Sequence, residues 1–209
     1  MTHELIGTGL RYDIDGRTIF ENVSVRASAG RMLAVRGPSG SGKSSLLGLL
    51  AGLLAPSAGT VTLDGEPVTS SGGVALRRRF ALVLQGYGLV AALTARENVA
   101  IVLQAAGVAR REVRAHVDEV LDAVGLAAVA DHLVEDLSGG QQQRVAVARA
   151  LVTSADVIVA DEPTAELDSE NRALVVALLL ERVRSGALVV IATHDQDVVD
   201  ACDDVLDLG

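Results

Sequence analysis

The chain has 209 residues, of which 49% are hydrophobic and 22% are charged. This length and composition predict one domain with room for an inserted subdomain, and they exclude a disordered or collagen-like chain. The net charge of −9 argues against nucleic acid as a partner, because binding to a phosphate backbone depends on Lys and Arg.

No segment has the pattern of a membrane span or a secretory signal. The longest apolar run, residues 46–55, is shorter than the roughly 18 to 20 residues of a spanning helix. The first residues lack a basic stretch followed by an apolar one, so we expect cytoplasmic residence. The single cysteine, Cys202, cannot form an internal disulfide, and the four histidines match no zinc-binding spacing.

The first third of the chain reads as short β-strands and turns. Residues 5–35 form β-type segments broken by turn signals at 13–16 and 28–30, which predicts an antiparallel region. An apolar strand at 33–36 then runs into a glycine-rich loop, and residues 44–54 have helical composition. Further strands are expected at 60–63 and 80–84.

The rest of the chain is first helical and then alternating. Apolar residues at spacings of three and four predict helices at 97–105, 111–124 and 140–151. After these, strands and helices alternate, at 157–160, 169–184, 188–192 and 196–201. We therefore predict an α/β fold with a mostly parallel sheet, helices on both faces, an N-terminal antiparallel β subdomain and an inserted helical subdomain at about 86–150 of a single domain, 1–209.

The loop after the strand at 33–36 matches the phosphate-binding pattern G-x-x-x-x-G-K-[ST] in full. Its backbone N–H groups and the N-terminus of the following helix suit phosphate oxygens, its lysine suits the β and γ phosphates, and its last serine suits Mg²⁺. A plain glycine-rich turn is the alternative, which the strand before and the helix after disfavour. The loop comprises Gly37, Pro38, Ser39, Gly40, Ser41, Gly42, Lys43 and Ser44. It predicts a P-loop NTPase core.

Two carboxylates follow the apolar strand at 157–160. Asp161 is suited to Mg²⁺, directly or through water, and Glu162 is suited to polarising the attacking water. Alone, such a pair is as often a solvated turn. The carboxyl end of a parallel strand is where an open α/β sheet binds its ligand, so the pair and the phosphate loop together favour a catalytic site.

A second glycine-rich helix start lies between these two motifs. The stretch 137–144 reads Leu-Ser-Gly-Gly-Gln-Gln-Gln-Arg and resembles the signature sequence of ATP-binding-cassette (ABC) ATPases. Read alone, it is a helix start capped by serine. Read as an anion site at a helix N-terminus, it makes a second half-site, meaning one side of a nucleotide site that another chain completes. Its residues are Ser138, Gly139, Gly140 and Gln141.

The resemblance to this family extends from Tyr12 to His194 and assigns further roles. Gln85 looks like the glutamine that reaches the metal and the nucleophilic water, and His194 is similar to the histidine that contacts the γ-phosphate. Asp168 looks like part of the loop that crosses to a partner subunit, and it is equally a candidate N-cap of the next helix. Tyr12 looks like the residue that stacks on adenine, with plain packing as the alternative. Ser45 follows the Mg²⁺-binding position.

The resemblance also implies a mechanism. Two copies would sandwich ATP between the phosphate loop of one and Ser138 and Gly140 of the other. Hydrolysis at Glu162 would separate them and drive separate transmembrane permease subunits, to which the chain would bind on the inner face of the membrane. The expected cofactors are ATP and Mg²⁺.

Two details concern the relation of the chain to this family: a resemblance to one subgroup and a departure from the common pattern. The stretches 93–99 and 141–144 look most like the short ATPases of lipoprotein release and macrolide export, which implies export or envelope work. Ala165 and Glu166 replace the common Ser-Ala, which adds a charge at the expected dimer contact. The alternative function is a regulatory or scaffolding module that is gated by nucleotide and moves no substrate.

Overall fold

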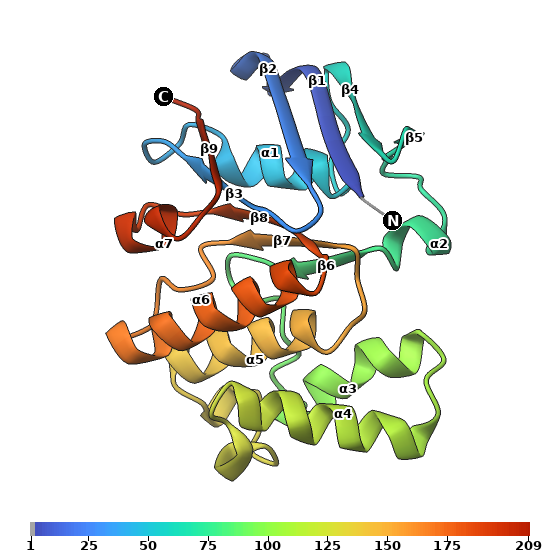
Figure 1. Ribbon diagram of the computed structural model, residues 1–209, viewed down its shortest axis with the longest axis vertical. Helices are drawn as coiled ribbons and strands as arrows, with labels where there is room; N and C mark the ends of the chain where they lie inside the picture. The colour runs from blue at the N-terminus through green and yellow to red at the C-terminus, as the bar shows by residue number, and fades with distance from the viewer. Residues whose placement is uncertain (1–2) are drawn as a thin grey trace.

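Two β-sheets organise the chain, of which the computed structural model describes residues 3–209 (Figure 1). The antiparallel sheet has the order β2 (Arg17–Ser28), β1 (Glu4–Ile14), β4 (Ala58–Leu63) and β5 (Glu66–Pro67). The parallel sheet has the order β6 (Phe80–Val83), β7 (Val157–Asp161), β8 (Leu188–Ala192), β3 (Met32–Arg36) and β9 (Asp204–Asp207). This architecture confirms the predicted α/β fold class.

Helix α1 (Lys43–Leu50) lies between the two sheets (Figure 1). Its leucines, among them Leu46 and Leu50, pack in one core with residues of both sheets. The sequence predicts a helix to residue 54, but α1 ends at Leu50. Gly52 adopts φ +66°, a left-handed conformation that ends helices and that L side chains rarely adopt.

Three helices cover the opposite face of the parallel sheet: α5 (Gly139–Leu151), α6 (Ser169–Arg184) and α7 (Gln196–Asp200). Val147, Val175, Leu179 and Val198 form a second core there with the strands. Strands β7 and β8 are buried along their whole length because helices lie on both sides of them, which explains their continuous apolar sequence.

A third apolar cluster lies within the helical part of the chain. It is built by α3 (Ala95–Ala105), α4 (Arg110–Ala123), the short 3₁₀ helices Ala127–Val129 and Val134–Asp136, and one side of α5. Val145 of α5 belongs to this cluster, whereas Val147 belongs to the core under the sheet. Helix α5 therefore joins the helical part to the sheet.

Strand β9 and the four-residue helix α2 (Val74–Arg77) were not expected from the sequence. The sequence of β9, Asp-Val-Leu-Asp, is too short and polar to show a strand pattern, and its side chains are mostly exposed. It forms because the edge of β3 offers unpaired backbone groups, with ion pairs from Arg31 to Asp204 and from Arg36 to Asp207 beside it. No helix in residues 3–209 has the length and apolar character that crossing a bilayer requires.

Candidate nucleotide site

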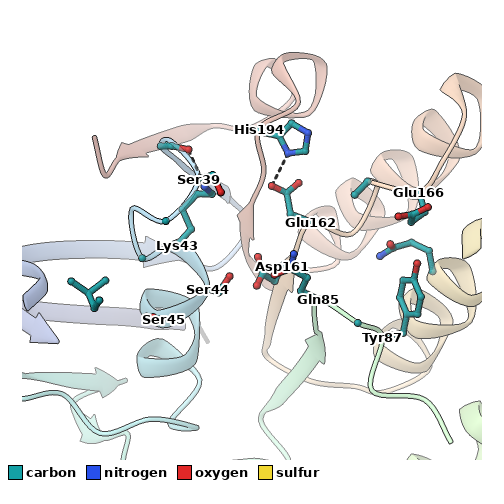
Figure 2. A pocket seen from close by; sticks show the side chains of 17 residues that line it. Ser39, Lys43, Ser44, Ser45, Gln85, Tyr87, Asp161, Glu162, Glu166 and His194 are labelled. Carbon is teal, nitrogen blue, oxygen red and sulfur yellow. Dashed lines mark hydrogen bonds and ion pairs between the residues drawn. The ribbon is translucent and has the colours of Figure 1, made fainter. Parts of the chain in front are cut away.

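A cavity of about 910 Å³ opens where the strands of the parallel sheet end (Figure 2). Segments that follow β3, β6, β7 and β8 line it, together with residues of α5 and β2. This is the edge at which open α/β sheets bind ligands. The lining residues are Ile19, Gly37, Ser39, Gly40, Gly42, Lys43, Ser44, Ser45, Gln85, Gly86, Tyr87, Gln143, Asp161, Glu162, Ala165, Glu166 and His194.

The phosphate loop has the geometry that an anion site needs. The Lys43 ammonium donates hydrogen bonds to the carbonyls of Gly37 (2.9 Å) and Pro38 (3.0 Å), which hold it inside the curve of the loop. Gly40 and Gly42 have φ of +82° and +94°, which turn the backbone into that curve. A Cβ at Gly42 would lie 2.7 Å from the Ile19 side chain, so only glycine fits. Within the described residues, the buried Ser41 hydroxyl has no hydrogen-bond partner.

Asp161 and Ser44 offer oxygen ligands for Mg²⁺. Asp161 is buried at the end of β7, and burial raises the pKa of its carboxyl, while the nearby Ser44 hydroxyl and Lys43 lower it. Mg²⁺ is usually held by one or two carboxylates together with substrate phosphates. In residues 3–209 no group of three His, Cys, Asp or Glu could hold a metal by itself. The carboxylate of Asp161 and the neighbouring hydroxyl of Ser44 fit a Mg²⁺ whose other ligands are nucleotide phosphates and water.

Glu162 and His194 form a direct pair at the mouth of the cavity (Figure 2). The Nδ1 of His194 lies 2.8 Å from Oε1 of Glu162, and the side chains are 73% and 15% exposed, respectively. Glu162 has φ +48°, held in part by a hydrogen bond from its N–H to the carbonyl of Ala192 on β8. A non-glycine residue in this conformation costs about 1–3 kcal/mol and is typical of functional sites.

The loop after β6 brings Gln85 and Tyr87 to the cavity. The side chain of Tyr87 lines the nucleotide cavity beside Glu166 (Figure 2). Burial and the charge of Glu166 raise the pKa of Tyr87. The sequence did not predict that this cavity is also lined by Tyr87, Glu166, Gln143 and Ile19, because no local pattern tells which residues of separate loops meet.

The motif at 138–141 lies outside this cavity and forms the N-terminus of α5. The Ser138 hydroxyl accepts a hydrogen bond from the Gln141 N–H (3.3 Å), and the Ser138 N–H donates one to the Gln141 side chain (2.9 Å). A Cβ at Gly140 would lie 2.8 Å from the Glu166 carbonyl oxygen, so Gly140 permits the close approach of the 165–168 segment. The capping interpretation therefore holds, and the second half-site stays a prediction.

Two other candidate residues also lie away from the cavity. Tyr12 packs against Phe20 with ring centroids 6.3 Å apart, and it is not among the cavity-lining residues. Asp168 caps α6 by accepting hydrogen bonds from the N–H and the side-chain amide of Asn171. Pro38 and Ser41 belong to the phosphate loop but do not line the cavity.

Comparison with known proteins places this chain in a family. The family model described as ABC transporter matches residues 20–165. A methionine import ATP-binding protein of Paraburkholderia xenovorans is 42% identical over 189 residues, which are 88% of this chain and 49% of that protein. One from Caulobacter vibrioides is 42% identical over 95% of this chain and 62% of its own length. The chain thus spans about half to three fifths of these relatives.

Solved structures give the same result. The chain superposes with a TM-score of 0.90 on a dimeric post-hydrolysis state of the ATP-binding cassette MJ0796 bound to ADP and Pi. The two are 32% identical, and the match covers 97% of this chain and 93% of that one. Another dimeric structure of MJ0796, described as a bacterial ABC transporter cassette, matches equally well.

Proposed function

The chain belongs to the ABC transporter family as its ATP-binding cassette, and on that premise we propose that it hydrolyses ATP to drive membrane subunits. The supporting observation is that one cavity is lined by Lys43 and Ser44 on one side and by Glu162 on the other, where Glu162 is hydrogen-bonded to His194. In this proposal Lys43 binds the phosphates, Asp161, Ser44 and Gln85 hold Mg²⁺, and Mg²⁺ supplies neutralisation of developing phosphate charge.

Glu162 acts as the general base in this proposal. Its carboxylate polarises the attacking water, and His194 keeps it oriented through the 2.8 Å contact while reaching the γ-phosphate. The left-handed backbone of Glu162 aims the side chain into the cavity from the end of β7.

The active form is a homodimer in which each nucleotide lies between two chains. Two observations support this arrangement: Ser138, Gly139, Gly140 and Gln141 lie outside the cavity of their own chain, and the matching MJ0796 structures are dimers. Asp168 and the exposed Glu166 would then lie near the partner. Separate permease subunits would receive the motion and hold the chain at the inner face of the cell membrane.

The test is steady-state ATP hydrolysis against protein concentration, with light scattering to follow the dimer. Activity that rises faster than linearly and disappears in Glu162→Gln, while an ATP-bound dimer accumulates, supports a composite site. ATP binding without hydrolysis at any concentration, also after addition of candidate permease subunits, would refute the motor and favour the regulatory module.

A further inference from the structure

The loop between β6 and the helical part has an unusual backbone. Three consecutive residues, Gly86, Tyr87 and Gly88, have φ of +80°, +64° and +58°. Glycine adopts this region readily, but a bulky aromatic residue there is an outlier that the surroundings must hold in place. The loop follows Gln85 directly, so whatever holds it also positions Gln85.

Arg149 of α5 holds this loop. Its Nη1 donates to the carbonyl of Gly88 (2.5 Å) and its Nη2 to the carbonyl of Tyr87 (2.7 Å). Burial lowers the pKa of Arg149, and in the described part of the chain no carboxylate is close enough to oppose that shift. A partly buried cation with no counter-charge depends on its hydrogen-bond acceptors, so separation of the loop from α5 would leave it unsatisfied.

The side chain of Tyr87 lies near the start of the same helix. A Cβ at Gly139, in the first turn of α5, would lie 3.7 Å from the Tyr87 hydroxyl and 3.4 Å from a Glu166 oxygen. Figure 2 shows the Tyr87 ring on the same side of the cavity as Glu166. The loop is therefore held to α5 through its backbone carbonyls near the end of the helix, and the Tyr87 hydroxyl lies near the first turn of the same helix.

We propose that Arg149 is a positioning residue that fixes the loop 85–88 to α5. Gln85 in one nucleotide site and Ser138 in the other half-site then move as one rigid body. The proposal rests on the ATP hydrolysis and the dimer proposed above. Its physical basis is that the guanidinium keeps two acceptors only while loop and helix move together. A change at Gln85 is then transmitted to the N-terminus of α5 about ten residues away, because a helix is stiff along its axis.

The chain provides a matched control for the test. Arg182 of α6 also donates to two carbonyls of a connecting segment, those of Thr153 (3.1 Å) and Ala155 (3.3 Å), but these two residues, unlike Tyr87, do not line the nucleotide cavity. Arg149→Met and Arg182→Met each remove one guanidinium and two hydrogen bonds to carbonyls. A purely structural role of Arg149 predicts the same behaviour for both variants.

The first readout is kinetic. We expect Arg149→Met to keep the Kd for ATP within about twofold and to lower kcat by about ten- to hundredfold, since displacement of a catalytic group by about 1 Å has effects of this size. Arg182→Met should retain the parent kcat, and Arg149→Lys should recover part of it, because lysine keeps the charge but not the paired donors. Gln85→Ala added to Arg149→Met should lower kcat little further, since both changes act on the same group.

The second readout does not require turnover. Hydrogen exchange of the amides at 86–89 should accelerate in Arg149→Met and remain unchanged in Arg182→Met, measured on the full chain with and without ATP. If wild-type protein binds ATP without hydrolysing it, also after addition of candidate permease subunits, the proposed function fails, while hydrogen exchange at 86–89 still decides the role of Arg149. Unchanged exchange at 86–89, or parent kcat in Arg149→Met, would overturn the inference.

Discussion

Two adjacent glycines at the start of α5 should respond in opposite ways to the same substitution. In Gly140→Ala the new Cβ would lie 2.8 Å from the Glu166 carbonyl oxygen and 3.4 Å from Leu167 Cδ2. The first contact is with backbone, which cannot rotate away. In Gly139→Ala the nearest atom is a Glu166 carboxylate oxygen at 3.4 Å, at the end of a flexible and exposed side chain.

The magnitudes follow from two opposing terms. Overpacking against a fixed neighbour costs about 1–3 kcal/mol, and replacing glycine by alanine in a helix gains up to about 1 kcal/mol. We expect Gly140→Ala to lower the free energy of unfolding by about 1–2 kcal/mol, and Gly139→Ala to raise it by about 0.5–1 kcal/mol. For a chain of this size each kcal/mol corresponds to about 2–4 °C in Tm.

The assay is urea unfolding of the nucleotide-free protein, followed by circular dichroism, with both variants measured beside the parent. The m-value should be unchanged, so that shifts in the midpoint report stability. Equal stability of the two variants, or a Gly140→Ala protein more stable than Gly139→Ala, would show that the 165–168 segment does not press against α5 as described.

Three further predictions concern the nucleotide site. Lys43→Ala should abolish ATP binding because it removes the ammonium that the loop carbonyls hold in the phosphate cradle; titration with an unchanged Kd would contradict the phosphate-loop assignment. Tyr12→Ala should weaken ATP and GTP binding alike, since stacking is insensitive to base identity; retention of both affinities would make Tyr12 a packing residue, in line with its contact to Phe20. Burial raises the pKa of Asp161, so its ionised form destabilises the nucleotide-free protein and stability is lost as pH rises through that pKa. Asp161→Asn should therefore raise the free energy of unfolding at pH 7 and weaken the Mg²⁺ dependence of ATP binding; a less stable variant in pH-dependent denaturation would refute this assignment.

Local sequence patterns predicted much of the secondary structure of this fold. Strands at 157–160 and 188–192 and the helix at 169–184 match the structure within one residue, because period and β-branched composition report burial directly. Boundaries were missed where one residue ended an element, as at Gly52, and β9 was missed because pairing with β3 rather than its own composition makes it a strand. Topology, with β3 between β8 and β9, is a long-range property that no local window contains.

The sequence by itself determined the contiguous motifs of this protein and the chemistry that each of them predicts. The phosphate loop, the Asp161-Glu162 pair and the motif at 138–141 are contiguous, so their residue types and spacing define what each can bind. Only the tertiary structure decided which of these parts meet: it joins Glu162 to His194, separated by 32 residues, and places Tyr87 beside Glu166. It also ties the loop after Gln85 to Arg149 and leaves Ser138 outside the cavity of its own chain. The physical reason is that these contacts depend on how strands are ordered and helices packed, and packing forces depend on distance in space and not on separation along the chain.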